Sequence, residues 1–325
     1  MGLTVAVTGP TGDIGISAVT ALEREPAVET IVGMARRPFD PCLRGWVKTT
    51  YQQGDILDRD AVEALVAQAD VVVHLAFIIM GSREESERIN LQGTRNVFEA
   101  TVSCPRPRRL VYTSSVAAYG YHSDNPVPLT EDVPPRGSPE HYYSAQKAAC
   151  EALLADISRD SSLEVFILRP CIVAGPKALG LADSMPWNRL PGPVRAVAKK
   201  VPVLKPVVPD PGFPLQLVHH DDVATAIALA ATAPTPPGSY NIAGDGVVTV
   251  GDVAKALGGR PVRVPAAAAA AAAAISRVPF APSMLEWLHI ARTSVVMDTT
   301  KAKKELGWRP VHSSAETLAE LASAL

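Results

Sequence analysis

The feature that most constrains this chain is a glycine-rich turn near its N-terminus, in the segment VAVTGPTGDIG. Gly9, Gly12 and Gly15 follow an apolar, strand-like run directly and open a helical pattern. Glycine suits a tight turn whose backbone must come close to a pyrophosphate. The N-terminus of the next helix would offer that anion free N–H groups and a positive dipole end. The segment therefore predicts a dinucleotide site, and the alternative is a tight turn that binds nothing.

Strand-like and helix-like segments alternate through the first half of the chain. Apolar, β-branched runs predict strands at 3–9, 29–35, 70–76, 109–115 and 164–170, with a weaker candidate at 49–55. Helical patterns lie between them, near 14–24, 59–68, 84–102 and 140–158. Continuous apolar strands indicate a sheet covered on both faces, and the alternation indicates parallel strands with crossover helices. We expect an α/β fold with a Rossmann-type, doubly wound parallel sheet.

The pattern changes after residue 173, where prolines become frequent, and it returns at LQLVHHDDVATAIALAA and SYNIAGDGVVTVGDVAKALG. We therefore predict a dinucleotide-binding Rossmann domain of residues 1–173 plus about 215–246. Residues 174–214 and 247–325 are predicted to form a smaller C-terminal substrate-binding lobe. The alanine run 266–274 predicts a helix, since alanine is the strongest helix former.

Composition argues against several classes of protein. The chain has 31 basic and 33 acidic residues, which gives no electrostatic reason to expect nucleic acid or a membrane as partner. The longest apolar run, VVVHLAFIIM, is too short to span a bilayer, and no signal-peptide pattern is present. A disulfide framework is not expected, because no C-x-x-C pair occurs among Cys42, Cys104, Cys150 and Cys171. We expect a cytoplasmic protein that acts on a small molecule.

A short run of metal-ligand residue types, His219 to Asp222, tests whether a metal should be expected. Neighbouring side chains on a strand point to opposite faces, so these four cannot easily converge on one ion. We therefore predict no metal site here, and we expect Asp221 or Asp222 to cap a helix.

The choice of cofactor is read about 20 residues after the glycines, at the end of the second predicted strand. Arg36 and Arg37 stand there, where an acidic residue would bind the ribose hydroxyls of NAD. Because guanidinium groups suit a 2′-phosphate, NADP(H) is favoured over NAD(H). The alternative is that an arginine stacks on adenine or points to solvent. Asp55 after the third strand could bond the adenine amino group or cap a helix instead.

Two adjacent tyrosines, Tyr142 and Tyr143, precede Lys147 in the segment EHYYSAQK. Residues four apart share a helix face, so Tyr143 points the same way as Lys147, and Tyr142 does not. A phenol is a poor base at neutral pH, but a nearby ammonium stabilises its phenolate form. The helix phase therefore predicts Tyr143 as a general acid/base and Tyr142 as part of a pocket wall.

Motifs along the chain occur in a recognisable order: TGPTGDIG, VVVHLA, NLQGTRNV, VYTSS, YSAQK, LRPCIVAGP, LVHHDDVATAI and LGWRP. In order and approximate spacing they resemble those of the extended short-chain dehydrogenases/reductases. That family also contains the nucleotide-sugar epimerases and dehydratases. The resemblance extends over nearly the whole chain, and it is more specific for the superfamily than for the reaction.

The resemblance implies a role for each matching residue. Tyr143 would be the general acid/base, Lys147 would lower its pKa and hold the nicotinamide ribose, and Ser115 would bond the substrate oxygen. Asn90 would support the structure around them or relay a proton. The implied cofactor-binding residues are Gly9, Thr11, Gly12, Asp13, Ile14, Gly15, Arg36, Arg37, Asp55, Ile56, Leu75, Ala76, Phe77, Thr113, Tyr143, Lys147, Pro170, Ile172 and Val173. The implied substrate-binding residues are Ile78, Met80, Ser115, Val116, Tyr142, Cys171 and Trp187. The resemblance also implies a homodimer through the long helices near 84–102 and 140–158.

Departures from the nucleotide-sugar enzymes favour one reaction over another. Ile172 stands where those enzymes usually carry an asparagine that grips the diphosphate, and SSVAAYG lacks the Thr-Asp-Glu set of the 4,6-dehydratases. The predicted pocket is also apolar, which suits an uncharged carbonyl compound. The leading hypothesis is an NADP(H)-dependent reductase or dehydrogenase of a ketone, an aldehyde or a secondary alcohol. The alternative is a nucleotide-sugar epimerase or dehydratase with tightly bound NAD, and a third is a non-catalytic NAD(P)-sensing regulator.

Overall fold

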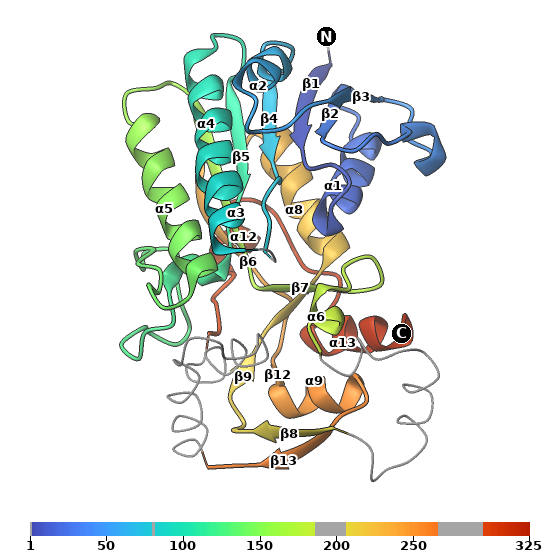
Figure 1. Cartoon of the computed structure of the whole chain (residues 1–325), viewed down its shortest axis with the longest axis vertical. Helices are drawn as coiled ribbons and strands as arrows, with labels where there is room; N and C mark the ends of the chain where they lie inside the picture. The colour runs from blue at the N-terminus through green and yellow to red at the C-terminus, as the bar shows by residue number, and fades with distance from the viewer. Residues whose placement is uncertain (1, 80–81, 186–205, 266–294) are drawn as a thin grey trace.

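A parallel sheet with helices on both faces makes up the larger part of the protein, and a smaller lobe of short strands and helices lies at one end of it (Figure 1). This computed structural model describes residues 2–79, 82–185, 206–265 and 295–325. The predicted pocket residues Met80 and Trp187 and the alanine run 266–274 lie outside the described residues.

The large sheet has seven strands in the order β11-β6-β5-β4-β1-β2-β3, all parallel to their neighbours. Their bounds are β1 Leu3–Thr8, β2 Val28–Ala35, β3 Thr49–Gln53, β4 Val71–His74, β5 Arg109–Thr113, β6 Glu164–Pro170 and β11 Gly238–Ile242. The chain winds outward from β1 to β3 and then crosses to β4 on the other side of β1. This reversal opens a crevice at the carboxyl ends of β1 and β4, where ligands bind in such sheets. The predicted doubly wound fold is confirmed.

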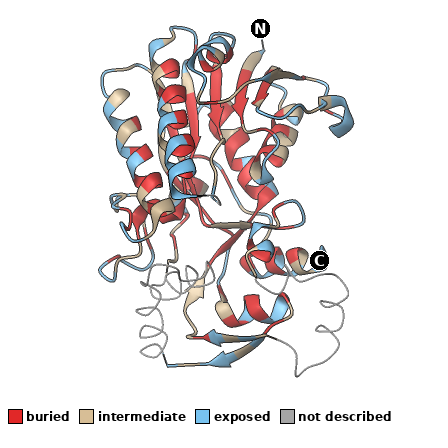
Figure 2. Cartoon of the chain, viewed as in Figure 1, coloured by how far each residue is buried: buried red, intermediate tan, exposed pale blue. Residues whose placement is uncertain are grey.

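Alternation along each strand places side chains in two separate cores. Val5 and Val7 of β1 pack on one face with α1 (Asp13–Arg24) and α8 (His220–Thr232). Ala6 points to the opposite core, with α2 (Arg59–Val66), α4 (Thr94–Ser103) and α5 (Tyr142–Ile157). Figure 2 shows buried segments concentrated along the strands and on the helix faces that cover them. Two covered faces explain why the strands are apolar runs rather than alternating patterns.

The prediction of a single helix at 84–102 is wrong, because the structure has three successive helical elements there. α3 (Arg83–Glu87) runs into a π-helical segment, η2 (Arg88–Gly93), and then into α4. Asn90, inside η2, bonds both backbone groups of Ile78 and the side chain of Gln146. These bonds, between parts of the chain far apart in sequence, favour the wider turn here, and π-turns frequently occur at functional sites.

The lobe is built from short paired strands. β7 (Ile172–Ala174) pairs with β10 (Leu217–His219), β9 (Pro214–Leu215) with β12 (Val248–Thr249), and β8 (Val207–Asp210) with β13 (Arg260–Arg263). The remaining short elements are η1 Pro41–Arg44, η3 Val116–Tyr119, α6 Gly180–Asp183, α9 Val250–Ala256, α12 Thr300–Lys304 and α13 Ser314–Ser323. Trp308 was predicted to belong to the lobe, yet it packs fully buried in the core shared by α1 and α8. Among the described residues, no helix is both long and apolar enough to cross a membrane.

His74, the last residue of β4, lies fully inside the protein between two hydroxyl groups. Its Nδ1 lies 2.7 Å from Thr8 Oγ1 on β1, and its Nε2 lies 3.0 Å from Thr94 Oγ1 on α4. Burial lowers the pKa of His74 to about 3, and the nearby charge of Lys147 adds to this effect. The imidazole is therefore neutral in the folded protein well below neutral pH.

We expect His74 to make the folded state sensitive to acid. Between pH 6.5 and about 3 the unfolded chain binds a proton at His74 that the folded chain does not, so its contribution destabilises the fold as pH falls. His74→Gln should lower the free energy of unfolding at neutral pH and should narrow its gap to wild type towards pH 4. Urea unfolding at a series of pH values measures this. A gap that stays constant with pH would contradict the assignment.

Candidate active site

The predicted acid/base residues meet at the start of α5. Tyr143 lies in the first turn of this helix, and Ser115 lies just before η3. Burial raises the pKa of Tyr143, and its hydrogen bond with Ser115 lowers it. The Lys147 Nζ lies 5.9 Å from the centre of the Tyr143 ring, whereas the Tyr142 hydroxyl is bonded to Ile79. The geometry is the one that the helix phase predicts, with one phenol beside both a hydroxyl and an ammonium.

Lys147 is held deep under Tyr143 by groups of β5. Its Nζ donates to the Thr113 carbonyl oxygen at 2.9 Å and to the Tyr112 hydroxyl at 3.4 Å. The Phe77 ring covers it, with its centre 3.5 Å from Nζ, and the edge of the same ring meets Tyr143. Burial lowers the pKa of Lys147 to about 7, although Cys150 and Glu151 oppose this shift. The lysine can therefore change its charge near neutral pH, which suits a group that adjusts the pKa of a neighbouring phenol.

Tyr142 points elsewhere and is already bonded. Its hydroxyl donates to the carbonyl oxygen of Ile79 at 2.8 Å, and its ring stacks on His141. This bond ties the start of α5 to the segment after β4, which contains the predicted pocket residue Ile78. Its place in a substrate pocket stays a prediction.

Asn90 lies behind this group and supports it. Its side-chain amide bonds the N–H and C=O of Ile78 at 2.9 and 2.8 Å and the Gln146 side chain at 2.9 Å. Gln146 directly precedes Lys147 on α5. The resemblance implied either structural support or a proton relay for Asn90. These contacts fit structural support, because Asn90 holds the loop after β4 against α5.

The three glycines have distinct geometry. Gly9 has φ +75°, and a Cβ on it would lie 2.9 Å from the Ala76 N. A Cβ on Gly15 would lie 2.1 Å from the Gly9 carbonyl oxygen, so this glycine permits close packing of α1 against the turn. A Cβ on Gly12 would meet nothing closer than 3.6 Å. Gly12 caps α1 without any side-chain bond, so the open space lies directly at the helix N-terminus.

The remaining predicted cofactor residues surround the crevice between β1 and β4. Thr11 and Asp13 are solvent-accessible residues at the start of α1. The Asp13 carboxyl is nevertheless partly shielded from water, and this desolvation, together with the charge of Asp183, raises its pKa. Arg36 and Arg37 are exposed directly after β2, and neither has an ion-pair partner in the described part of the chain. Ile14 lies in the first turn of α1, and Ile56, Leu75 and Ala76 lie in the turns after β3 and β4. Pro170 is the last residue of β6, and Ile172 and Val173 belong to β7.

The sequence left two roles open for Asp55, a bond to adenine or a helix cap, and in the structure its carboxylate makes a different contact. It accepts a hydrogen bond from the Leu57 N at 3.0 Å, within the turn that follows β3. Asp58, not Asp55, caps α2, because its side chain accepts from the N–H groups of Asp60 and Ala61. The helix-cap reading of Asp55 is therefore wrong, and its contact with adenine stays a prediction.

Two observations show that a dinucleotide fits these residues. The N-terminus of α1 faces the open space at Gly12, where uncapped N–H groups can bind a pyrophosphate. Thr113 Oγ1, at the end of β5 beside Lys147, is buried without a hydrogen-bond partner among the described residues. A bound nucleotide would supply the missing partner for such a group.

Sequence reasoning missed a buried polar network behind the site. The Ser114 Oγ donates to Glu151 Oε1 at 2.5 Å, and Arg169 of β6 pairs with the same carboxylate at 2.6 Å. Arg169 also donates to the Tyr119 hydroxyl, which in turn donates to Asn241 of β11. Glu151 lies four residues after Lys147 on one helix face, a spacing that could have identified it. Nothing local identifies Asn241.

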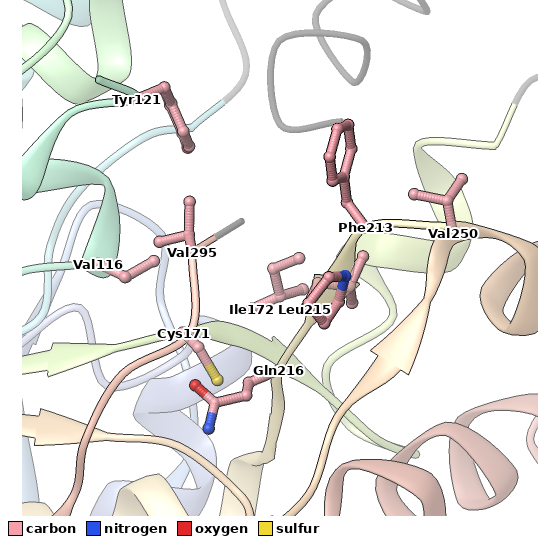
Figure 3. Close-up of a pocket in the computed structure, with 10 residues that line it drawn as sticks. Val116, Tyr121, Cys171, Ile172, Phe213, Leu215, Gln216, Val250 and Val295 are labelled. Atoms are coloured by element: carbon pink, nitrogen blue, oxygen red, sulfur yellow. The ribbon is translucent and has the colours of Figure 1, made fainter. Parts of the chain in front are cut away.

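A narrow cleft that opens to solvent begins at Val116, the residue after Ser115 (Figure 3). It is lined by side chains from both parts of the chain: Val116, Tyr121, Cys171, Ile172, Phe213, Pro214, Leu215, Gln216, Val250 and Val295. Three of these, Val116, Cys171 and Ile172, were predicted site residues. The lining is almost entirely apolar, and the amide of Gln216 is occupied by the backbone of Met297.

Comparison with known proteins agrees with this geometry. The NAD dependent epimerase/dehydratase family matches residues 5–243. The chain belongs to this family. Its Rossmann fold is that of the extended short-chain dehydrogenases/reductases, and it is an enzyme of that superfamily.

The similar proteins have names that point to different substrates or to none. An uncharacterized protein of Mycobacterium tuberculosis (strain ATCC 25618 / H37Rv) is 26% identical over 323 residues, 96% of this chain and 81% of the relative. Human 3 beta-hydroxysteroid dehydrogenase type 7 is 35% identical over 170 residues, 47% of this chain and 44% of that protein. The structure of MoeE5 in complex with UDP-glucuronic acid and NAD superimposes with a TM-score of 0.72 at 23% identity, covering 99% of this chain and 98% of that one. At that identity the structural likeness shows the fold alone.

The glycine geometry predicts opposite effects for two matched substitutions. Gly15→Ala should destabilise the protein by about 1–3 kcal/mol, because its Cβ would overlap the Gly9 carbonyl oxygen. Gly12→Ala should leave the melting temperature nearly unchanged and should weaken dinucleotide binding roughly tenfold or more, since its methyl group would occupy the pyrophosphate position. Thermal unfolding and fluorescence titration measure the two effects, and an exchange of the two phenotypes would refute the assignment.

The tyrosine pair gives a second matched prediction. Tyr143→Phe should lower kcat by roughly 10²–10⁴-fold and leave cofactor affinity intact, because it removes only the acid/base hydroxyl. Tyr142→Phe should mainly change KM, because it releases Ile79 from the start of α5. Steady-state kinetics with both variants measures the split. Loss of kcat in Tyr142→Phe rather than in Tyr143→Phe would sink the helix-phase assignment.

Proposed function

We propose that the protein is an NAD(P)-dependent oxidoreductase that interconverts an apolar ketone or aldehyde and its alcohol. The observation that carries the proposal is the narrow apolar cleft at Val116, which offers no fixed cation among its described lining residues. Such a lining binds an uncharged, hydrophobic substrate better than a diphosphate. Similarity of part of the chain to a 3 beta-hydroxysteroid dehydrogenase supports a hydrophobic alcohol or ketone.

In this proposal the residues of the chain position one oxygen and handle one proton. Ser115 and Tyr143 both donate hydrogen bonds to the substrate carbonyl oxygen, and Tyr143 gives it a proton as the alcohol forms. Lys147 stabilises the resulting phenolate from below, and Phe77 keeps water away from the lysine. In reduction the hydride would come from a bound nicotinamide cofactor, and in oxidation it would return to that cofactor.

NADP(H) is the proposed cofactor. Arg36 and Arg37 are exposed residues directly after β2, and their guanidinium groups suit a 2′-phosphate. The neighbouring structure of MoeE5 contains NAD, which makes NAD(H) the alternative. A homodimer through α4 and α5 stays part of the proposal.

The second candidate is a nucleotide-sugar epimerase, in which the hydride returns to the same sugar. The likeness of the fold to MoeE5, bound to UDP-glucuronic acid, favours it. Against it stands Ile172 in the lining of the cleft, at the position where the sugar enzymes usually carry asparagine.

A paired assay distinguishes the two candidates. Oxidation of NADPH and NADH is followed with apolar ketones and aldehydes, including 3-oxosteroids, and the conversion of UDP-sugars is followed by chromatography. We expect net cofactor oxidation with an apolar carbonyl and a lower Kd for NADPH than for NADH. Sugar conversion without net cofactor turnover would overturn the oxidoreductase proposal.

A substitution in the cleft tests whether the substrate binds against its apolar lining. Phe213→Asp should raise KM for an apolar carbonyl roughly tenfold or more with little change in kcat, because it places a charge where the substrate loses water. Val207→Asp, at an exposed position of the same lobe, is the matched control and should behave as wild type. Equal KM values for Phe213→Asp and wild type would place the substrate elsewhere.

A further inference from the structure

A phenylalanine ring covers the buried ammonium of the proposed acid/base group. The Lys147 Nζ lies 3.5 Å from the centre of the Phe77 ring, whereas the centres of the Tyr112 and Tyr143 rings are 5.0 and 5.9 Å away. The Phe77 ring also meets the Tyr143 ring edge to face, with their centres 5.7 Å apart and their planes at 86°. Phe77 therefore contacts the lysine and the tyrosine at once.

The ammonium has more N–H groups than hydrogen-bond acceptors. Of its three donors, one is met by the Thr113 carbonyl oxygen and one by the Tyr112 hydroxyl. No carboxylate pairs with it in the part of the chain that the structure describes, because Glu151, one turn further along α5, is paired with Arg169. The face of the Phe77 ring attracts a cation and so takes the place of a third acceptor.

The ionisable groups around Lys147 leave its charge in balance near neutral pH. Burial lowers the pKa of Lys147 to about 7, and Cys150 and Glu151 on α5 oppose this effect. Burial keeps His74 of β4 neutral, and it raises the pKa of Tyr112 on β5, so both groups face the lysine without a charge. The lysine therefore responds to any further group that favours its ammonium form.

The position of Phe77 is fixed through the residue that follows it. Asn90 bonds the N–H and the C=O of Ile78 and also the side chain of Gln146, which directly precedes Lys147. The loop that carries the ring and the helix that carries the lysine are therefore joined through one side chain. This keeps the ring face on the ammonium.

We propose that Phe77 is a positioning residue for the reaction, and that the face of its ring holds the Lys147 ammonium charged beside Tyr143. The inference rests on the proposed function, in which the charged lysine stabilises the Tyr143 phenolate. An aliphatic side chain would still cover the lysine, but it would offer no electron-rich face. Phe77 thus acts through Lys147 and not on the substrate.

The test measures the titration of Lys147 directly in the full chain without cofactor or substrate. The protein is labelled with ¹³C-lysine, the Cε resonance of Lys147 is assigned by its loss in Lys147→Met, and its shift is followed with pH. Phe77→Leu should lower the midpoint by about one pH unit. Trifluorophenylalanine at position 77, which keeps the shape of the ring but weakens its attraction for a cation, should also lower it. Phe39→Leu, whose ring packs on Tyr51, is the control and should leave the midpoint unchanged.

The direction of the shift decides between two roles of the ring. If Phe77 only excludes water, the smaller leucine admits water, and the Lys147 midpoint should rise or stay where it is. Either result would overturn the inference. The trifluorinated ring gives the same decision where Phe77→Leu does not fold.

A kinetic measurement connects the lysine to the reaction. In alcohol oxidation Tyr143 accepts a proton as phenolate, and loss of the Lys147 charge raises the pKa of that phenol. The rise of kcat/KM with pH should therefore move to higher pH in Phe77→Leu, whereas an equal loss at every pH would show a merely structural role and refute the inference. The resonance measurement needs no turnover. An unmoved Lys147 midpoint thus refutes the role of Phe77 alone, and absence of carbonyl turnover refutes the proposed function alone.

Discussion

The buried ion pair between Glu151 and Arg169 is the contact on which the site depends most. Both side chains are almost fully enclosed, at 3% and 4% exposed, and they join α5 to β6. An ion pair in this setting does not add much stability by itself, but loss of one partner leaves an unpaired buried charge and costs about 3–5 kcal/mol. Only one placement of α5 against the sheet keeps this ion pair intact. That helix carries Tyr143 and Lys147.

Further contacts remove the remaining freedom of α5. Ser144 donates to the Ala117 carbonyl oxygen at 2.6 Å and accepts from the Ser138 N, which fixes the first turn. Gln146 is bound by Asn90 from the π-helical segment. With the first turns and the middle of the helix anchored, its rotation about its axis is set, and Tyr143 rather than Tyr142 faces Ser115. The choice between two chemically identical phenols is therefore made by packing.

The parts that sequence reasoning found are those controlled by local rules. Strand and helix periods, the glycine turn and the four-residue spacing of Tyr143 and Lys147 are set by residues close in the chain, and the fold follows from them. The break at η2 was missed because Asn90 acts through Ile78 and Gln146, which no local pattern connects to it. The same limit applies to the run from His219 to Asp222, where two predictions are wrong. His219, and not Asp221 or Asp222, caps α8, and the turn from strand to helix brings ligand atoms of His219, His220 and Asp221 within 4.8 Å of one another. His312 and Glu320, from the C-terminal segment, also contact His219, and no local pattern connects them to it.

The proposed cofactor site and the cleft are formed by different parts of the chain, and this explains why the family is easier to assign than the substrate. The carboxyl ends of β1, β4 and β5 present the glycine turn, Phe77 and Thr113, which we propose to serve the cofactor and the proton transfer. The cleft beyond Ser115 is formed largely by short segments of the lobe, such as Phe213, Leu215 and Val250. Short, irregular segments can change without disturbing the two cores of the sheet. Substrate choice can therefore vary while the acid/base group stays fixed, and this cleft, rather than the catalytic motif, is where the reaction must be identified.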